Sequence, residues 1–470
     1  MACVEKLHIV MFPWLAFGHI FPYLKLAKLM AAKGHKISFV SATPKNIDSL
    51  PKIPQNLAPF INLVKMPLPL VPNLPENAES TTEVPFHKVK YLKLMYDLLQ
   101  EPITRFLESS TADWILADYV SYWLRPIASR LRIRWCPYNI FTASFMGFLG
   151  PPSNLIKGDG YRVKPEDFTV KPEWVHFDTN VAMSLYQSLA LAAGYETDEE
   201  TGNVSEAYRV GRSLEYFDMV AIRSSVEFEG DWLKLLQDMY EKPVIPVGLL
   251  PDVEESKEDD NEDWSEIKDW LDKQAKGSVL FVAFGSEAKL TQAQTTELAL
   301  GLELTGLPFF WAMKKQRGLS DTEPVELPEG FQDRTRGRGM IYTTWVPQTK
   351  ILDHESVSAL LNSSGYSSVV EAMQFGKALI LLPCVYDQGI IAKQLEEKKL
   401  GFQIPRDESD GGFTRESVAE SVNLVMLDEE GKIYRDNVKD MQAILCDMDK
   451  QNGYVDNLLN YLQNHKFSKN

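Results

Sequence analysis

Short apolar runs alternate with helical patterns twice along this chain, once on each side of an acidic segment. In the first half, Leu7–Phe12, Lys36–Ser41 and Trp114–Ala117 are typical of buried strands. Phe21–Ala32 has helical spacing and stops before Gly34. Because strands and helices alternate, we expect a parallel sheet with helices on both of its faces.

The alternation starts again after Pro251–Asp263, which is acidic, lacks apolar periodicity and is the best candidate for a linker. The expected second-half elements are a helix at Ala293–Leu304 and strands at Val279–Phe284, Pro308–Met313, Met340–Thr344, Val357–Leu361 and Ala378–Pro383. The region from Gly150 to Gly202 is rich in Pro, Gly, aromatic and acidic residues, and we expect a variable substrate loop there rather than core.

A chain of 470 residues is too long for one ordinary core, so these patterns predict two doubly wound, Rossmann-like α/β domains. The expected divisions are 1–245 for the N-terminal acceptor-binding domain, 246–265 for the linker and 266–450 for the C-terminal domain. Residues 451–470 contain an amphipathic helix that we expect to pack back across the domains. Ligands of such a protein bind in the cleft between the domains, at the carboxyl ends of the strands.

The net charge of −16 argues against a nucleic-acid partner or an anionic membrane surface. A bound phosphate must therefore be held by helix N-termini and backbone N–H groups. The four cysteines have no metal-ligand spacing, and no acidic pair is placed for a metal, so we expect no metal and no cofactor. The absence of a signal-like N-terminus and of a long apolar run leads us to expect a soluble, cytoplasmic protein without stable membrane insertion.

The most informative motif is the stretch from Trp345 to Gln388, WVPQTKILDHESVSALLNSSGYSSVVEAMQFGKALILLPCVYDQ. An aromatic follows a strand, a small-residue turn at 363–365 opens a helix, and Glu371 lies about two turns into that helix. The pair Asp387-Gln388 follows the next strand and opens another helix. In this order the pieces fit a flat base, a diphosphate, a ribose and a sugar. Each residue alone could equally be a helix cap or a core residue, but that alternative does not explain the joint spacing.

This pattern closely resembles the signature of plant UDP-dependent glycosyltransferases of family 1, which have the GT-B fold, two Rossmann-like domains facing across a cleft. The resemblance covers the whole chain, from FPWLAFGHIFPYLKLAKLMAAKGHKISFVSA near the start to IPRDESDGGFTRESV near the end. It looks most like the branch that adds a second sugar to steviol, saponin or flavonoid glycosides. It implies an inverting enzyme, expected to be a monomer, that binds a UDP-sugar, with glucose favoured and rhamnose next, and a small-molecule glycoside acceptor.

The resemblance also implies roles for individual residues. Trp345 would stack on uracil, Gln348 would reach the base or ribose, and Glu371 would accept hydrogen bonds from the ribose hydroxyls. Asp387 and Gln388 would bind the hydroxyls of the sugar. The full implied donor site consists of Ser286, Trp345, Val346, Gln348, Ser363, Gly365, Tyr366, Ser367, Ser368, Glu371, Asp387 and Gln388.

The chain departs from the family at one important place. The family usually has a His-Cys-Gly-Trp-Asn-Ser run, and here residues 363–368 read Ser-Ser-Gly-Tyr-Ser-Ser. The missing His normally donates to a phosphate oxygen, and Ser363 carries no charge. The loss is expected to cost about 1–2 kcal/mol of diphosphate binding, the scale of one charge-assisted hydrogen bond. A degenerate member that binds UDP-sugar or glycoside with little turnover is therefore the alternative function.

A second candidate site is His19, which we expect in the loop between the first strand and its helix. A lone His there could be a structural cap, but the family uses this His as a general base. Asp118 ends a later strand of the same sheet and could fix the tautomer and stabilise the imidazolium. A weaker prediction is an acceptor pocket lined by Trp14, Phe17, Tyr119, Phe141, Ser144 and Phe145. A nicotinamide-dependent Rossmann enzyme is disfavoured, because no GxGxxG follows a strand.

Overall fold

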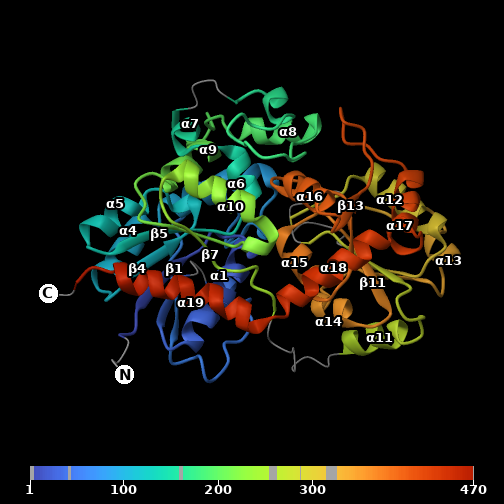
Figure 1. The fold of residues 1–470 in the computed structure, drawn as a ribbon, viewed down its shortest axis with the longest axis horizontal. Helices are drawn as coiled ribbons and strands as arrows, with labels where there is room; N and C mark the ends of the chain where they lie inside the picture. Colours follow the sequence, from blue (N-terminus) through green and yellow to red (C-terminus); the bar gives the residue numbers. More distant parts are fainter. Residues whose placement is uncertain are drawn as a thin grey trace.

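The structure is a computed structural model that describes residues 5–40, 44–157, 162–252, 262–285, 287–313 and 325–468. It has two lobes, each built around one parallel sheet with helices on both sides (Figure 1). The first lobe runs from blue to green in the figure and the second from yellow to red. The predicted two-lobed α/β architecture is therefore confirmed.

The sheet of the first lobe has the strand order β3-β2-β1-β4-β5-β6-β7, seven strands within the described residues. Its strands are β1 (His8–Phe12), β2 (Lys36–Val40), β3 (Ile61–Val64), β4 (Trp114–Ala117), β5 (Arg134–Asn139), β6 (Val220–Ile222) and β7 (Val244–Pro246). The order reverses between β1 and β4, which pair in parallel. Such a reversal is the usual place of a ligand site in a doubly wound sheet.

The sheet of the second lobe repeats this scheme in the order β10-β9-β8-β11-β12-β13, six strands within the described residues. Its strands are β8 (Val279–Ala283), β9 (Phe309–Ala312), β10 (Gly339–Tyr342), β11 (Val357–Asn362), β12 (Ala378–Leu381) and β13 (Gly401–Gln403). The order reverses between β8 and β11. Each lobe therefore offers its own binding edge, at the loops that follow the first and fourth strands.

The strands of both sheets are apolar because helices cover both faces. Every residue of β1, β4, β8 and β12 is buried. Alternate residues of one strand enter different cores: Ile9 and Met11 belong to one apolar cluster, and Val10 and Phe12 belong to the other. This is the two-residue period of a strand, and it explains why a continuous apolar run marks a central parallel strand.

Helices connect the strands within each lobe. Those of the first lobe are α1 (Phe17–Ala32), α2 (Pro44–Asp48), α3 (Val89–Asp97), α4 (Gln100–Glu108), α5 (Leu124–Arg130), α6 (Ala143–Leu149), α7 (Pro152–Lys157), α8 (Leu185–Ala193), α9 (Glu206–Ser213) and α10 (Val226–Tyr240). Those that follow are α11 (Glu262–Leu271), α12 (Gln292–Thr305), α13 (Phe331–Arg334), α14 (Gln348–Asp353), α15 (Tyr366–Gln374), α16 (Gln388–Glu397), α17 (Arg415–Met426), α18 (Lys432–Leu445) and α19 (Met448–His465). Short 3₁₀ turns lie at Thr81–Glu83, Phe86–Lys88, Tyr119–Ser121 and Pro165–Phe168.

The last helix, α19, leaves the second lobe and lies along the first, as Figure 1 shows. Its Val455, Leu458 and Leu462 belong to the apolar cluster that also contains Ile9 and Met11 of β1. The indole N–H of Trp114 donates to the carbonyl oxygen of Leu462 at 2.9 Å. The C-terminal helix thus completes one face of the N-terminal sheet.

The expectation of a coreless loop between Gly150 and Gly202 is wrong. The described part of this region forms α7, α8 and a 3₁₀ turn, and its Leu155, Phe168 and Val181 are buried in the core of the first lobe. The high Pro and Gly content interrupts the helices, but the apolar residues between the interruptions still pack. The region also reaches the second lobe, since the Thr179 hydroxyl donates to Glu397 at 2.7 Å.

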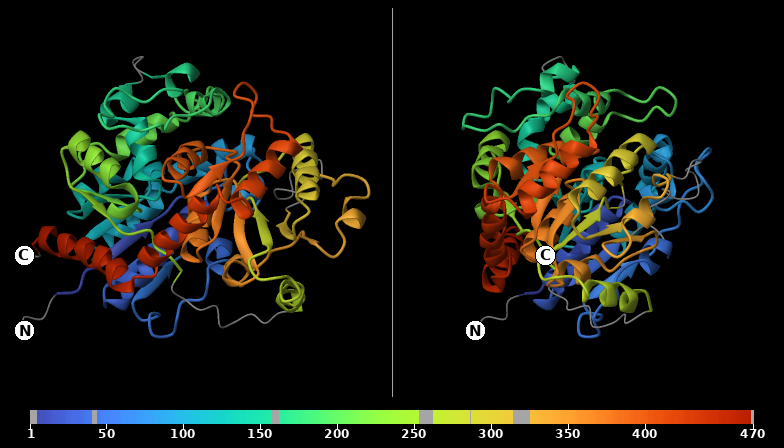
Figure 2. Two further views of the ribbon diagram at one scale, coloured as in Figure 1. Left: turned by 45° about the vertical axis from the view of Figure 1, so that its right-hand side comes forward. Right: turned by 90° about the vertical axis from the view of Figure 1, so that its right-hand side faces the viewer.

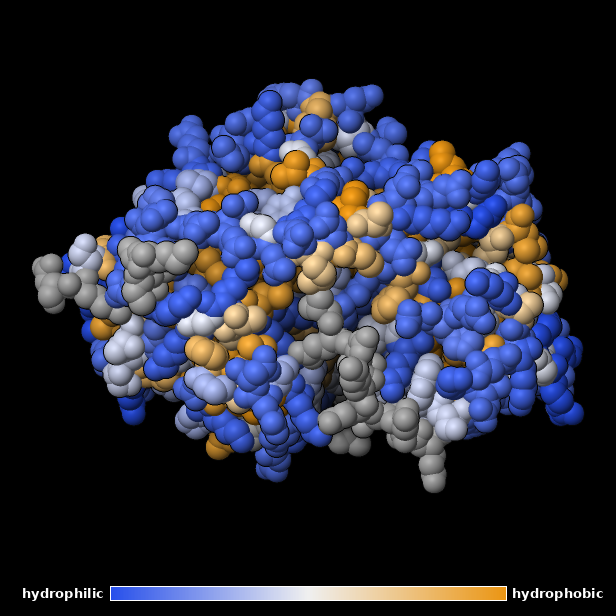
Figure 3. All heavy atoms as spheres, turned by 60° about the horizontal axis from the view of Figure 1, so that its bottom comes forward, coloured by the Kyte–Doolittle hydropathy of each residue, from blue (hydrophilic) through white to orange (hydrophobic). Residues whose placement is uncertain are grey.

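Figure 2 shows that this region lies over one end of the molecule, above both lobes. The face in Figure 3 is mostly hydrophilic, with small scattered apolar areas. Within the described ranges, the structure contains no helix long and apolar enough to cross a membrane. The predicted linker 246–265 includes residues 253–261, which lie outside the described residues.

Candidate active site

His19 and Asp118 meet at the reversal point of the first sheet. The Nδ1 atom of His19 lies 2.7 Å from Oδ2 of Asp118. Because a carboxylate only accepts, Nδ1 carries the proton and Nε2 is left as the basic atom. The side chain of His19 is 12% exposed and that of Asp118 is 2% exposed, so the pair is largely shielded from solvent and His19 is its more exposed member. The sequence prediction that these two residues pair is therefore supported by their geometry.

The prediction that His19 lies in a loop is wrong, because α1 begins at Phe17 and His19 lies in its first turn. The helix extends one turn before the predicted start, with the His19 N–H donating to the Ala16 carbonyl oxygen at 2.8 Å. Pro22 lies inside α1, in its second turn, where it has no N–H to donate to the Gly18 carbonyl oxygen.

Asp118 is held in place by the backbone. Its Oδ1 accepts from the Tyr119 N–H at 2.8 Å, and its Oδ2 accepts from the Trp14 N–H at 3.2 Å. A carboxylate with several fixed donors does not rotate away from its partner. Asp118 therefore orients the imidazole of His19 without the help of a ligand.

Burial favours the neutral imidazole, but the charge and hydrogen bond of Asp118 outweigh it and raise the pKa of His19 above its ordinary value. Asp387 and Glu287 of the second lobe raise this pKa further. Their influence shows that the loops of the second lobe that follow β8 and β12 lie close to His19. The ring of Phe141 stands edge-on to His19, with centroids 5.5 Å apart.

In the second lobe, Ser363, Ser364 and Gly365 follow β11, and Gly365 is the N-cap of α15, as predicted from the small-residue turn. The first turn of a helix leaves backbone N–H groups free for an anion, and the helix dipole favours negative charge there. Ser363 is buried, and its hydroxyl donates to the Phe284 carbonyl oxygen at 3.3 Å. The arrangement provides a diphosphate-sized anchor made of backbone rather than of charged side chains.

Glu371, Gln348 and Ser368 form one polar group on the face of α15. The amide Nε2 of Gln348 donates to Glu371 Oε2 at 2.6 Å and to Ser368 Oγ at 3.2 Å. Burial raises the pKa of Glu371, while Lys25 and the hydrogen bond from Gln348 oppose this. Trp345 is 70% exposed, and its neighbour Val346 is buried in the core of the lobe. The exposed indole of Trp345 and the carboxylate of Glu371 have the chemistry predicted for contacts with a base and a ribose.

Asp387 is the N-cap of α16, and Gln388 is its first residue. Burial raises the pKa of Asp387 to about 6, although a backbone hydrogen bond and His19 oppose the shift. The side-chain oxygen of Gln388 accepts from the N–H groups of Cys384 and Val385 at 2.9 and 3.0 Å. Only the amide nitrogen of Gln388 therefore remains to bind a sugar hydroxyl.

Tyr366 and Ser367 face the first lobe. The Tyr366 hydroxyl donates to the Arg223 carbonyl oxygen at 3.0 Å, and its ring stacks on Phe228. Arg223 in turn donates from Nη1 to the Ser367 hydroxyl at 2.9 Å. The structure thus uses these two residues of the donor motif to join α15 to the first lobe.

The six residues predicted for the acceptor pocket divide into two groups. Phe17, Tyr119 and Phe141 are partly exposed around His19. The side chains of Trp14, Ser144 and Phe145 are buried, and the Ser144 hydroxyl donates to Gln394 Oε1 at 2.9 Å. The residues of the second group are therefore core residues, and only the first group is accessible to an acceptor.

Ser286 lies outside the described residues. Among those that are described, no group of three or more His, Cys, Asp or Glu residues could hold a metal ion. Sequence reasoning missed Glu206 and Lys93, which lie beside Tyr119, because they come from distant segments without a motif.

Comparisons with known proteins agree with this geometry. Residues 233–451 match the family model UDP-glucoronosyl and UDP-glucosyl transferase. The chain is 50% identical over 459 residues to UDP-glycosyltransferase 91A1 of Arabidopsis thaliana, covering 97% of each protein. It is 42% identical to the soyasaponin III rhamnosyltransferase of Glycine max, covering 98% of this chain and 96% of the relative.

A solved structure with the same fold is that of UGT2 of Phytolacca americana complexed with UDP-2fluoro-glucose and pterostilbene. It is 24% identical to this chain and has a TM-score of 0.72. The match covers 98% of this chain and 99% of the Phytolacca americana chain. The fold is therefore GT-B. Given the identity to plant relatives over nearly the whole length, this chain belongs to the plant family 1 UDP-glycosyltransferases and is an enzyme of glycosyl transfer.

Proposed function

We propose that this enzyme transfers glucose or rhamnose from its UDP-sugar to a hydroxyl on the sugar of a small terpenoid or flavonoid glycoside, with inversion. The observation that carries the proposal is the His19–Asp118 pair, in which the carboxylate orients the imidazole at 2.7 Å. The charge of Asp387, the residue proposed to hold the donor sugar, also acts on His19, and this supports a base close to the donor. The name of the Glycine max rhamnosyltransferase supports rhamnose and a saponin-type acceptor as candidates.

The proposed mechanism follows from these positions. The acceptor hydroxyl lies between His19 Nε2 and the anomeric carbon, and His19 takes its proton as the oxygen attacks. UDP leaves from the opposite face, and the N–H groups at the start of α15 stabilise its growing charge. Asp118 stabilises the imidazolium that forms. Trp345, Gln348 and Glu371 are proposed to hold the uridine. The cytoplasmic location and the monomeric state stay predictions.

The test is a calorimetric titration with UDP-glucose, UDP-rhamnose and NAD, followed by a panel of glycosides with the donor that binds. We expect a UDP-sugar to bind and mass spectrometry to show a gain of one hexose or deoxyhexose on a glycoside. Binding without product on the whole panel would instead support the degenerate-binder alternative.

We expect the rate to fall in acid through His19. A general base acts only when neutral, so kcat/KM is low below the raised pKa of His19 and rises as the pH passes through it. In Asp118→Asn the anion that raises this pKa is lost. The acid limb should then move to lower pH, while kcat itself drops. A profile of kcat/KM against pH for both proteins measures this, and an unmoved limb would contradict the pairing.

Ser363→His is expected to tighten UDP-glucose binding about 5- to 30-fold, the equivalent of about 1–2 kcal/mol. The imidazole would add a donor to a site that now relies on the helix terminus, since the Ser363 hydroxyl is directed to Phe284. Calorimetry gives the dissociation constant, and Ser363→Leu controls for side-chain bulk without a donor. If the constant is the same in the His variant, the start of α15 already suffices.

A further inference from the structure

We propose that Glu206, Lys93 and Tyr119 form a subsite beside His19 that binds hydroxyl groups of the sugar already present on the acceptor. This inference rests on the proposed function and deepens it, because it assigns the part of the cleft that would distinguish a glycoside from a free aglycone.

The three residues are joined to the catalytic pair through Tyr119. The backbone N–H of Tyr119 donates to Asp118, and its ring lies 6.3 Å from the ring of His19 between centroids. The hydroxyl at the other end of the same side chain donates to Glu206 Oε2 at 3.0 Å. Glu206 is therefore separated from the base by one aromatic side chain.

Tyr119 belongs to a group of rings around His19. Its ring lies 5.8 Å from that of Phe141 between centroids, and Phe141 stands edge-on to His19 at 5.5 Å. Burial raises the pKa of Tyr119 most strongly, and the charge of Glu206 raises it further. Glu206 is therefore bound to a residue that packs around the imidazole of His19.

The ion pair retains unused hydrogen-bonding capacity. Glu206 accepts from Tyr119 and from the ammonium of Lys93, yet its side chain remains 34% exposed and that of Lys93 is 19% exposed. A carboxylate offers about four lone-pair sites and an ammonium three donors, so both groups can take further partners. Hydroxyl groups of a sugar both donate and accept, so one pyranose ring can satisfy both.

The opposite charges of Glu206 and Lys93 disfavour charged ligands. Burial favours the neutral acid, but Lys93 outweighs it and holds the pKa of Glu206 below its ordinary value. The carboxylate is therefore ionised and neutralised by its partner, so the subsite has no net attraction for an anion or a cation. Charge-assisted hydrogen bonds to neutral hydroxyls are the interactions that remain.

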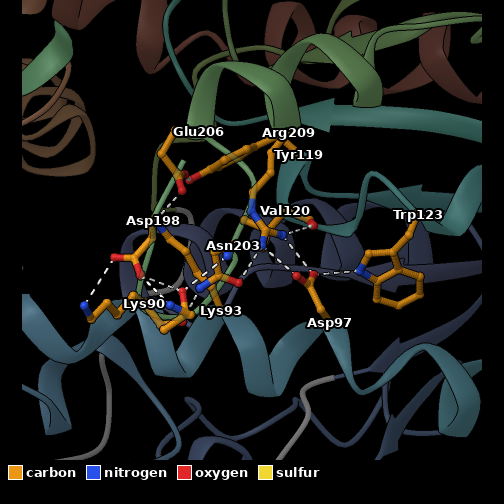
Figure 4. A network of polar contacts seen from close by, with 11 residues as sticks. Lys90, Lys93, Asp97, Tyr119, Val120, Trp123, Asp198, Asn203, Glu206 and Arg209 are labelled. Carbon is orange, nitrogen blue, oxygen red and sulfur yellow. Dashed lines mark hydrogen bonds and ion pairs between the residues drawn. The ribbon is translucent and has the colours of Figure 1, made fainter. Parts of the chain in front are cut away.

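The group is also part of a larger network of polar contacts, drawn in Figure 4. Arg209, one helical turn after Glu206 on α9, is fully buried and donates to both carboxylate oxygens of Asp97 at 2.8 and 2.6 Å. Arg209 also donates to the Val120 carbonyl oxygen at 3.3 Å, next to Tyr119. This bond fastens α9 to the loop that carries Tyr119, so Glu206 is positioned before any ligand arrives. Preorganised polar groups bind with less ordering cost.

The test uses Glu206→Gln, which keeps the size and removes the charge. The probe is the glycoside that gives product with the wild-type enzyme, together with its free aglycone as a competitive inhibitor. We expect the KM of the glycoside to rise about tenfold, as for the loss of one charge-assisted hydrogen bond. The inhibition constant of the aglycone and the dissociation constant of UDP should stay unchanged.

Glu200→Gln is the matched control, because Glu200 also accepts from one lysine and one tyrosine, Lys90 and Tyr91, but is more exposed. Its KM should equal that of the wild type. An unchanged KM in Glu206→Gln, or an equal rise in the aglycone constant, would overturn the subsite. If Glu206→Gln does not fold, the KM of the glycoside and the inhibition constant of the aglycone are measured for Lys93→Met instead. A wild-type enzyme inactive on every glycoside would instead overturn the proposed function, and the subsite with it.

Discussion

His19→Ala is expected to abolish sugar transfer while UDP binding survives. The imidazole of His19 is oriented by Asp118 at 2.7 Å, and the charge of Asp387 also acts on it. Removal of a general base costs roughly 10²–10⁴-fold in rate. The residues proposed to hold the uridine lie on the second lobe, so the dissociation constant of UDP should change little. Single-turnover kinetics and calorimetry measure the two quantities separately.

His465→Ala is the matched control for this variant, since His465 ends α19 and is exposed. It should keep both the rate and the affinity of the wild type. Loss of UDP binding in His19→Ala would show that His19 holds the donor instead of activating the acceptor. A rate close to that of the wild type would remove His19 from the mechanism altogether.

Glu229→Gln is expected to lower the free energy of unfolding by about 3 kcal/mol, a large effect for an exchange of one atom. Glu229 is 1% exposed, and its two oxygens accept from the backbone N–H groups of Ala143 and Ser144 at 2.9 and 2.8 Å. An amide has only one acceptor atom, so one of these buried N–H groups would face an NH₂ group. Unsatisfied buried donors of this kind cost about 1–3 kcal/mol each, and the lost charge adds to this.

The same carboxylate joins the two lobes. Its Oε1 accepts from Nε2 of Gln394 at 3.0 Å, and Gln394 lies on α16, the helix that begins at Gln388. Glu229→Gln should therefore also weaken the contact between α16 and α6. Urea unfolding measures the stability, and Asp238→Asn, the same exchange at an exposed site of α10, should stay within about 0.5 kcal/mol of the wild type. Equal stabilities of both variants would mean that water or another donor replaces the lost interaction.

The central strands could be predicted from the sequence because burial on both faces requires unbroken apolar runs. Trp114–Ala117 has the predicted limits, and His8–Phe12 differs from its prediction by one residue. The region between Gly150 and Gly202 could not be predicted in this way, because its short helices pack through a few isolated apolar residues that have no clear period.

The start of α1 shows a second limit of sequence reasoning. A proline at position 22 is compatible with a helix that starts next to it or one turn earlier. The choice depends on the backbone after β1, and it decides that His19 lies on the first turn, directed at Asp118. In the same way, the sequence did not indicate that Tyr366 and Ser367, which are predicted for the donor site, also form hydrogen bonds with Arg223 of the first lobe.

The sequence by itself determined the family, the two-lobed α/β fold and the positions of the loops that follow β1, β4, β11 and β12. It could do so because strand burial, helix caps and motif spacing are local properties of the chain. Only the tertiary structure decided which side chains from distant segments meet, such as Glu206 with Tyr119 and Gln394 with Glu229. These pairs are 87 and 165 residues apart, and no local pattern relates them, because the packing of helices on two sheets sets their distance.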